Sequence, residues 1–170
     1  MGGKGLAIEK DDAFQRREWR AQRVGWAAMA LVLALAAAGL FGTGPLSKAS
    51  VEGQANGIVA SLEHPRLTRH GVPEQVSIVV SSPSSEAPLR LRFEGEWIRS
   101  AKVESIAPPP AGGSVAAGGA TYEWDVGSGG PWRVQFSVRA ERPGHAAGAV
   151  AVEVGDRAGP RLPLEWFSWP

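Results

Sequence analysis

One segment without charged side chains divides the chain into two parts with different hydrophobic patterns. From Val24 to Ser47 the sequence contains no Asp, Glu, Lys or Arg, and residues 24–42 are almost wholly apolar. An α-helix over those residues would be roughly 28 Å long, which matches the hydrocarbon core of a bilayer. The Gly and Pro residues from Gly42 to Pro45 are typical of a helix end. The sequence therefore predicts a transmembrane helix over residues 24–42.

Basic residues on one side of this segment predict its orientation. Six Lys or Arg precede it, and only Lys48 stands in the twenty residues after it. Because cytoplasmic flanks carry the excess of Lys and Arg, we expect residues 1–23 to form a cytoplasmic basic leader and the remainder to lie outside the cytoplasm. A cleavable signal peptide, cut near Ala38, is the main alternative, although its apolar core would be shorter. A buried helix of a soluble protein is the other.

Side chains around this helix predict what it contacts. Several basic and tryptophan residues near its start are expected to meet lipid headgroups at the membrane interface: Arg16, Arg17, Trp19, Arg20, Arg23 and Trp26. Small residues recur every four positions and form one ridge: Ala30, Ala34, Ala38 and Gly42. Such a ridge lets a second helix approach closely. We therefore expect packing against an integral membrane partner or a second copy, the alternative being accidental spacing in an Ala-rich span.

Beyond residue 50, apolar side chains alternate with polar ones. The alternation is clear in residues 76–80, 89–93, 132–138 and 150–154, and weaker in residues 57–63, 97–106, 121–126 and 162–167. A period of two is typical of strands with one face in a core. Clusters of Pro and Gly between these runs are typical of turns. We therefore predict seven or eight short strands, no long helix in this part, and a mainly β fold class.

This strand pattern favours an antiparallel β-sandwich of the immunoglobulin or fibronectin type III kind over residues 54–170. Residues 43–53 would then be a linker, and residues 108–119 the longest loop, exposed and mobile. The chain has no Cys, so Trp97, Trp124 or Trp132 would fill the centre that a disulfide occupies in antibody domains. An open barrel is the alternative, and the strand order does not follow from the pattern.

The charges give no reason to expect nucleic acid as a partner. The formal net charge of +1 combines +2 in residues 1–23 with −1 in the rest, which has 12 Lys or Arg and 13 Asp or Glu. A nucleic-acid interface needs a concentrated basic field. The absence of Cys further excludes disulfides, thiolate metal ligands and a cysteine nucleophile.

Two groups of polar residues are considered as a metal site and as a catalytic pair, and neither has a diagnostic pattern. His64 and His70 are six residues apart, which is not the ligand spacing of a structural metal site. Glu94 and Glu96 would share one face of a strand, as paired carboxylates do in glycosidases, but outward carboxylates are also common on surface strands. We therefore predict no catalytic, metal-binding or cofactor-binding residue, and no cofactor.

Aromatic residues crowd the C-terminus. Trp166, Phe167 and Trp169 occur within four positions of a chain that has seven Trp. Adjacent side chains of a strand point to opposite faces, so Trp166 and Phe167 cannot both enter one core. Exposed aromatics mark contact surfaces, and we take these three residues as a candidate contact surface. The alternative is a terminal strand that closes the sandwich.

Residues 14–47, apolar and Arg-rich and followed by a β-rich part, resemble small bacterial single-pass membrane proteins with an extracytoplasmic β domain. The resemblance implies an anchor in the bacterial inner membrane and implies no activity. A composition of fourteen Arg against four Lys also favours a GC-rich bacterial genome. We expect a non-enzymatic accessory or interaction protein that contacts membrane lipid and a membrane partner. The alternative is a periplasmic sensory module for a small molecule, glycan or envelope component.

Overall fold

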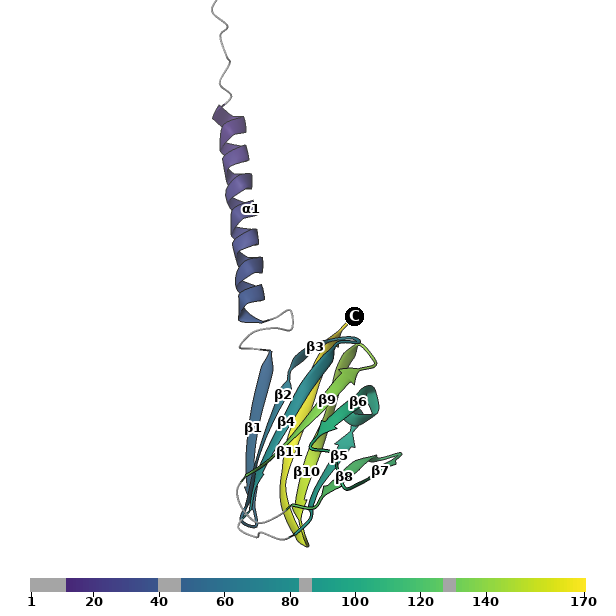
Figure 1. Ribbon diagram of the computed structural model, residues 1–170. Coiled ribbons are helices and arrows are strands. Elements are labelled where there is room, and N and C mark those ends of the chain that lie inside the picture. The colour runs from purple at the N-terminus through teal and green to yellow at the C-terminus, as the bar shows by residue number, and fades with distance from the viewer. Residues whose placement is uncertain (1–11, 40–46, 83–86, 127–130) are drawn as a thin grey trace, which may run out of the picture.

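The computed structural model describes residues 12–39, 47–82, 87–126 and 131–170, which form one long helix and a β-sandwich (Figure 1). Helix α1 (Asp12–Ala38) is continuous from the basic leader into the apolar segment. It ends four residues before the predicted limit because Gly39 adopts a φ of 94°, and its N–H donates to the carbonyl of Ala36 over 3.0 Å. Residues 40–42 of the predicted span lie outside the described residues.

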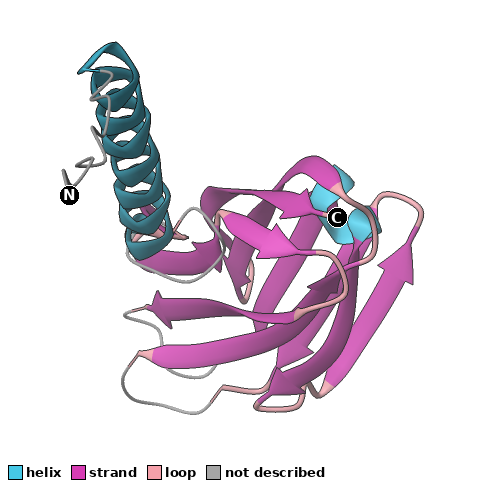
Figure 2. Cartoon of the chain, turned by 90° about the horizontal axis from the view of Figure 1, so that it is seen from above, coloured by secondary structure: helices cyan, strands magenta, loops and turns pink. Residues whose placement is uncertain are grey.

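Two sheets face each other beyond the helix (Figure 2). The strands of the first sheet, in spatial order, are β1 (Lys48–Ala55), β2 (Ile58–Pro65), β4 (Pro73–Ser81), β9 (Trp132–Ala140) and β6 (Ala101–Ala107). Those of the second are β3 (Leu67–Arg69), β11 (Arg157–Trp169), β10 (Gly144–Val154), β5 (Leu89–Gly95), β8 (Gly119–Trp124) and β7 (Gly112–Ala116). All neighbours are antiparallel except β3 and β11, which pair in parallel. The predicted mainly β, two-sheet sandwich is confirmed.

The core lies between the sheets and is built from the residues whose alternation predicted strands. In β4, Val76, Ile78 and Val80 are fully buried, whereas their neighbours along the strand are exposed or half-buried. The same pattern places alternate residues of β5, β9 and β10 in the core. Burying these aliphatic side chains is the main favourable contribution to folding, at about 25 cal/mol per Å² of apolar surface.

One predicted strand begins instead as a short helix. Residues 97–100 belong to α2 (Glu96–Ser100), and β6 starts only at Ala101. The chain leaves the sheet at Gly95, whose φ of 95° favours glycine. A Cβ at this position would overlap the Cα of Gly148 in β10. This turn carries Trp97 back into the core, where its ring centroid lies 4.9 Å from that of Trp166. Two tryptophans, one expected in the centre and one not, therefore pack together there.

Three strands were not predicted. Residues 48–53, which we predicted as linker, belong to β1, and residues 112–116 of the predicted long loop form β7. Both are edge strands, and their alternation is weak because β1 is at most half-buried and β7 is fully exposed. The third, β3, has only three residues. Strands this short or this exposed leave no hydrophobic period in the sequence.

Candidate interaction surfaces

The end of the sandwich at which the chain passes from α1 into β1 forms one surface, which we call the entry end. It consists of Lys48 and residues 66–73, 140–145 and 167–170. The carbonyl of Ser47, just before β1, accepts backbone N–H groups from Arg66 at 2.6 Å and Leu67 at 3.4 Å. The C-terminus lies at this same end (Figure 1).

The C-terminal aromatics divide between the core and the entry end. Trp166 is only 1% exposed, and its ring packs on Trp97. Its inclusion in a contact surface was therefore wrong, because its position in β11 points inward. Phe167 and Trp169 are 37% and 44% exposed on the opposite face, with ring centroids 4.8 Å apart in an edge-to-face arrangement. They present one aromatic pair to the outside of the entry end.

A third apolar side chain, Val72, is exposed in the turn before β4. Five large hydrophobic side chains are exposed among the described residues of the sandwich: Val59, Val72, Val115, Phe167 and Trp169. The second, fourth and fifth of these are at the entry end. The backbone N–H of His70 donates to the carbonyl of Trp169 over 2.8 Å, which connects this turn to the end of β11. The apolar side chains of the entry end thus come from two segments that are hydrogen-bonded together.

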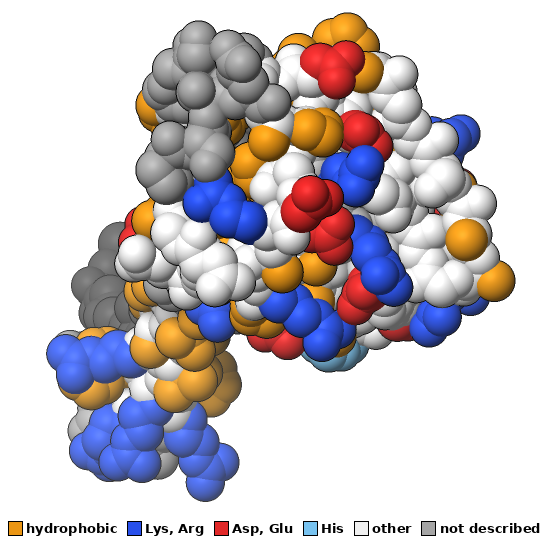
Figure 3. Space-filling model, turned by 90° about the horizontal axis from the view of Figure 1, so that it is seen from below, with side chains coloured by type: hydrophobic (Ala, Val, Ile, Leu, Met, Phe, Trp, Pro, Cys, Tyr) orange, Lys and Arg blue, Asp and Glu red, His pale blue; other side chains and the backbone are white. Residues whose placement is uncertain are grey.

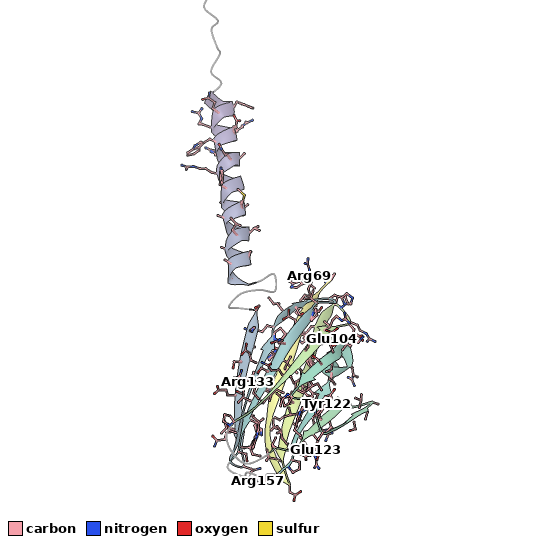
Figure 4. The ribbon with its side chains drawn as sticks, in the orientation of Figure 1. Arg69, Glu104, Tyr122, Glu123, Arg133 and Arg157 are labelled. Carbon is pink, nitrogen blue, oxygen red and sulfur yellow. The ribbon has the colours of Figure 1, made fainter. Side chains whose placement is uncertain are left out.

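Arginine side chains surround these apolar residues. Arg66, Arg69 and Arg142 are exposed and form no ion pair with any of the described residues. Arg69 extends from the top of the sandwich in Figure 4, on the side of α1. Lys48 of this end pairs with Glu63 at 3.0 Å, and Arg139, just before residues 140–145, pairs with Glu104 at 2.8 Å.

Two open hollows lie between these cations. One of about 380 Å³ is lined by His70, Gly71 and residues 139–142, among them Arg139, Glu141 and Arg142. Another of about 410 Å³ lies between β1 and β11 and includes Lys48, Arg66, His64 and Glu165. Both hollows are thus lined by basic side chains, with one carboxylate in each.

His64 is a buried polar group beside the second hollow. Its side chain is 2% exposed, and Nδ1 lies 3.1 Å from the carbonyl oxygen of Pro65. Burial lowers the pKa of His64, against the smaller opposing effects of that backbone contact and of the Glu165 carboxylate. The imidazole is therefore held neutral, as a structural polar group.

Helix α1 presents its apolar residues to the outside. The most apolar 18-residue window within Phe14–Ala38 has a mean hydropathy of 1.5 and no buried residue. Ala30 and Ala34 are exposed and Ala38 is half-buried on the predicted ridge, while Gly42 lies outside the described residues. The guanidinium of Arg23 lies 3.5 Å from the ring centroid of Trp19. Basic side chains gather at one end of this helix (Figure 3).

A further pocket of about 330 Å³ opens far from the entry end. Its walls include Pro108, Pro109, Trp124 and Trp132, with Asp125 and Arg133 among its polar residues. The indole N–H of Trp124 donates to the carbonyl of Pro108 over 2.9 Å, which fixes one wall. Trp124 is buried, as expected, and Trp132 is half-buried.

Glu94 and Glu96, considered above as paired carboxylates, lie in different elements and are each paired with arginine. Glu94 lies in β5 between Arg92 at 3.0 Å and Arg161 at 2.9 Å, whereas Glu96 lies in α2 and pairs with Arg99 at 2.8 Å. The two carboxylates therefore do not share one strand face. Among the described residues, no three His, Asp or Glu side chains come close enough to hold a metal ion.

Comparison with known proteins gives similarities of architecture. No protein-family model matches the chain. A comparison with curated protein sequences finds no match. Among solved structures, a cohesin module from the Clostridium perfringens ATCC13124 family 33 glycoside hydrolase is 9% identical, with a TM-score of 0.48 over 69% of this chain and 98% of that one. A non-cellulosomal cohesin from the archaeon Archaeoglobus fulgidus is 11% identical, with a TM-score of 0.44 over 73% and 92%. These likenesses imply no shared ligand or activity.

Proposed function

We propose that this chain is a non-enzymatic, single-pass membrane protein whose helix packs beside a membrane partner and whose sandwich presents a contact surface outside the cytoplasm. The observation that carries the proposal is the exposure of the apolar face of α1: the most apolar window within Phe14–Ala38 contributes nothing to the core of the protein. Apolar surface of that extent is unfavourable in water. A bilayer would bury it.

The orientation follows from the basic residues at the start of α1. Arg16, Arg17, Arg20 and Arg23 are all exposed, and Trp19 and Trp26 stand beside them at the level of an interface. This arrangement supports a cytoplasmic leader and an extracytoplasmic sandwich in a bacterial inner membrane. The ridge of Ala30, Ala34 and Ala38 supports a helix partner, either an integral membrane protein or a second copy.

Membrane fractionation and labelling test this proposal. The chain has no Cys, so single cysteines at Glu18 and Val115 report the two sides of the membrane. We expect the full chain to stay in membranes washed with alkaline carbonate. In spheroplasts, a membrane-impermeant maleimide should label Val115→Cys and leave Glu18→Cys unlabelled. Release by carbonate, or the reverse labelling, would overturn the proposal.

Crosslinking in native membranes tests the partner. We expect α1 to be crosslinked to a second protein or to another copy of this chain, identified by mass spectrometry of the crosslinked peptides. Recovery of the chain only as an uncrosslinked monomer would contradict helix packing while leaving the anchor intact.

The pocket beside Trp124 favours a second candidate function. Aromatic and proline walls with a few polar groups are typical of ligand sites, which agrees with an extracytoplasmic sensory module. A ligand of that pocket should raise the melting temperature of the full chain and lose this effect in Trp132→Ala. A panel of envelope glycans and small solutes that leaves the melting temperature unchanged would count against it.

A further inference from the structure

We infer that the entry end of the sandwich docks on an anionic lipid surface, the same bilayer that holds α1. The inference rests on the proposed membrane anchor and adds a specific ligand, the phosphate-bearing headgroups. Three observations carry it, all at one end of the sandwich: a short tether (the chain between Gly39 and Ser47), exposed apolar side chains, and arginines that form no ion pair with any described residue.

The tether limits how far the entry end can be from the membrane. Gly39 ends α1, and Ser47 is hydrogen-bonded to the corner between β2 and β3. The eight residue steps between them span at most about 28 Å even when fully extended. Ser47 itself is buried, so the tether cannot lengthen by peeling β1 away without opening the sandwich. The surface within reach of the bilayer is therefore the entry end.

Apolar and aromatic side chains lie where that surface would meet the headgroups. Val72, Phe167 and Trp169 are exposed together, and the two rings contact each other. Aromatic side chains favour the boundary between headgroups and acyl chains, where an apolar ring is covered and polar atoms remain hydrated. If this end faced water, these three side chains would remain exposed without apolar surroundings.

The cations around this cluster complement a negative surface. Arg66, Arg69 and Arg142 form no ion pair within the described part of the chain, and Arg142 and His70 line a hollow beside Trp169. Arginine binds phosphate oxygens through two parallel N–H donors. Glu141 in this hollow, Glu165 in the hollow beside Arg66 and the half-buried Glu74 reduce the positive potential of this end, whereas Arg69 lies outside both hollows and is exposed.

Among the described residues, the opposite end of the sandwich has no exposed aromatic side chain. It faces the viewer in Figure 3, where acidic and basic side chains alternate over its surface. Asp125 and Asp156 are exposed there, and Arg90 is paired with Glu123 at 2.9 Å. Arg133, which lines the pocket far from the entry end, is also exposed and forms no ion pair with any described residue, so the exposed aromatic pair distinguishes the entry end more clearly than charge does.

Spin labelling of the full chain in vesicles tests the inference. Single cysteines at Val72 in the entry end and at Val115 on the exposed strand β7 carry the nitroxide, in vesicles of phosphatidylglycerol with phosphatidylcholine or of phosphatidylcholine alone. We expect the Val72 label to collide more with lipid-soluble oxygen than with a water-soluble nickel complex, in the anionic vesicles only. The Val115 label should prefer the nickel complex in both.

Substitutions then separate the two contributions. Arg66→Gln, Arg69→Gln and Arg142→Gln together should abolish the dependence on phosphatidylglycerol, and Phe167→Ser with Trp169→Ser should lower oxygen collisions. All five side chains are exposed, so circular dichroism should remain that of the wild type. A Val72 label that prefers the nickel complex in both lipids would overturn the inference.

Two further outcomes distinguish the competing explanations. If the chain resists carbonate extraction but the Val72 label stays in water, lipid docking fails while the proposed anchor stands. If carbonate releases the chain, the anchor itself fails. A label that is immobilised in native membranes but stays in the aqueous phase in pure lipid vesicles would assign the entry end to a protein partner and overturn the lipid assignment.

Discussion

The backbone N–H of Phe167 donates to the carbonyl of Arg66 over 2.8 Å, and the N–H of Arg66 donates to the carbonyl of Ser47 over 2.6 Å. These two hydrogen bonds join the end of the tether, an arginine that has no ion pair among the described residues, and an exposed aromatic ring in one corner of the sandwich. The end of the tether is therefore fixed next to the side chains that we propose contact the membrane.

Trp166 and Trp169 are three residues apart on one strand, so their side chains point to opposite faces and differ in burial. Trp166 is 1% exposed and packs on Trp97, whereas Trp169 is 44% exposed. Trp166→Ala should lower the free energy of unfolding of the sandwich by about 3–5 kcal/mol, because it leaves a cavity in the core. Urea denaturation of the full chain in mild detergent, followed by circular dichroism, measures this change.

Trp169→Ala is the matched control for that substitution. An exposed side chain should change the free energy of unfolding by only about 0.5 kcal/mol. Equal losses for the two variants would contradict the assignment of Trp166 to the core and of Trp169 to the surface.

Gly148 in β10 is packed against the strand that leads into α2. A Cβ at this position would overlap the carbonyl oxygen of Glu94 and lie 3.1 Å from Cβ of Trp97. Gly148→Ala should therefore destabilise the sandwich by about 1–3 kcal/mol, since the backbone of β5 would have to shift. Gly112→Ala, where a Cβ meets nothing within 4 Å, should leave the melting temperature nearly unchanged. A harmless Gly148→Ala would show that β5 and β10 are not this close.

The strands that could be predicted are those with one face fully in the core. In β4 and β9 the buried residues are all aliphatic or aromatic, so the period of two is strong, and the predicted runs 76–80 and 132–138 lie within the observed strands. β1 and β7 lie at sheet edges, where weak burial imposes no such pattern. α2 has five residues, too few to show a helical period, and its formation depends on the close approach of Gly95 and Gly148.

The candidate surface could be predicted only in part, because its residues come together through strand order. Alternation in β11 implies that Trp166 and Phe167 face opposite ways, but which of them points inward depends on the register with β10. Arg66 and Arg142 are far apart in sequence, and they share one end because β3, β11 and β10 are adjacent in the second sheet. No local pattern in the sequence encodes that adjacency.

His64 should make the stability of the sandwich depend on pH. Burial lowers its pKa from the usual 6.5, and the nearby Arg66 acts in the same direction while Glu165 opposes it. In the unfolded chain the imidazole binds a proton below about pH 6.5, whereas the folded chain resists protonation. The free energy of unfolding should therefore be highest above pH 6.5 and fall as the pH decreases towards the lowered pKa of the folded state.

Thermal melts at pH 7.5, 6.5 and 5.5 measure this dependence. His64→Gln removes the titrating group, so its melting temperature should change less between these pH values than that of the wild type. His70→Gln is the control, because that side chain is exposed and forms no ion pair with any described residue. If His64→Gln keeps the full pH dependence, other groups are responsible.

Ala34 is the centre of the ridge on α1, with Ala30 one turn before it and Ala38 one turn after. Ala34→Ile places a branched side chain where a second helix would approach, so it should lower the association signal in a membrane two-hybrid assay. Ala36→Ile adds the same volume about 200° around the helix and should leave association unchanged. Equal effects of the two substitutions would indicate a general effect on insertion and contradict a specific ridge, and association that neither variant alters would show that α1 acts only as an anchor.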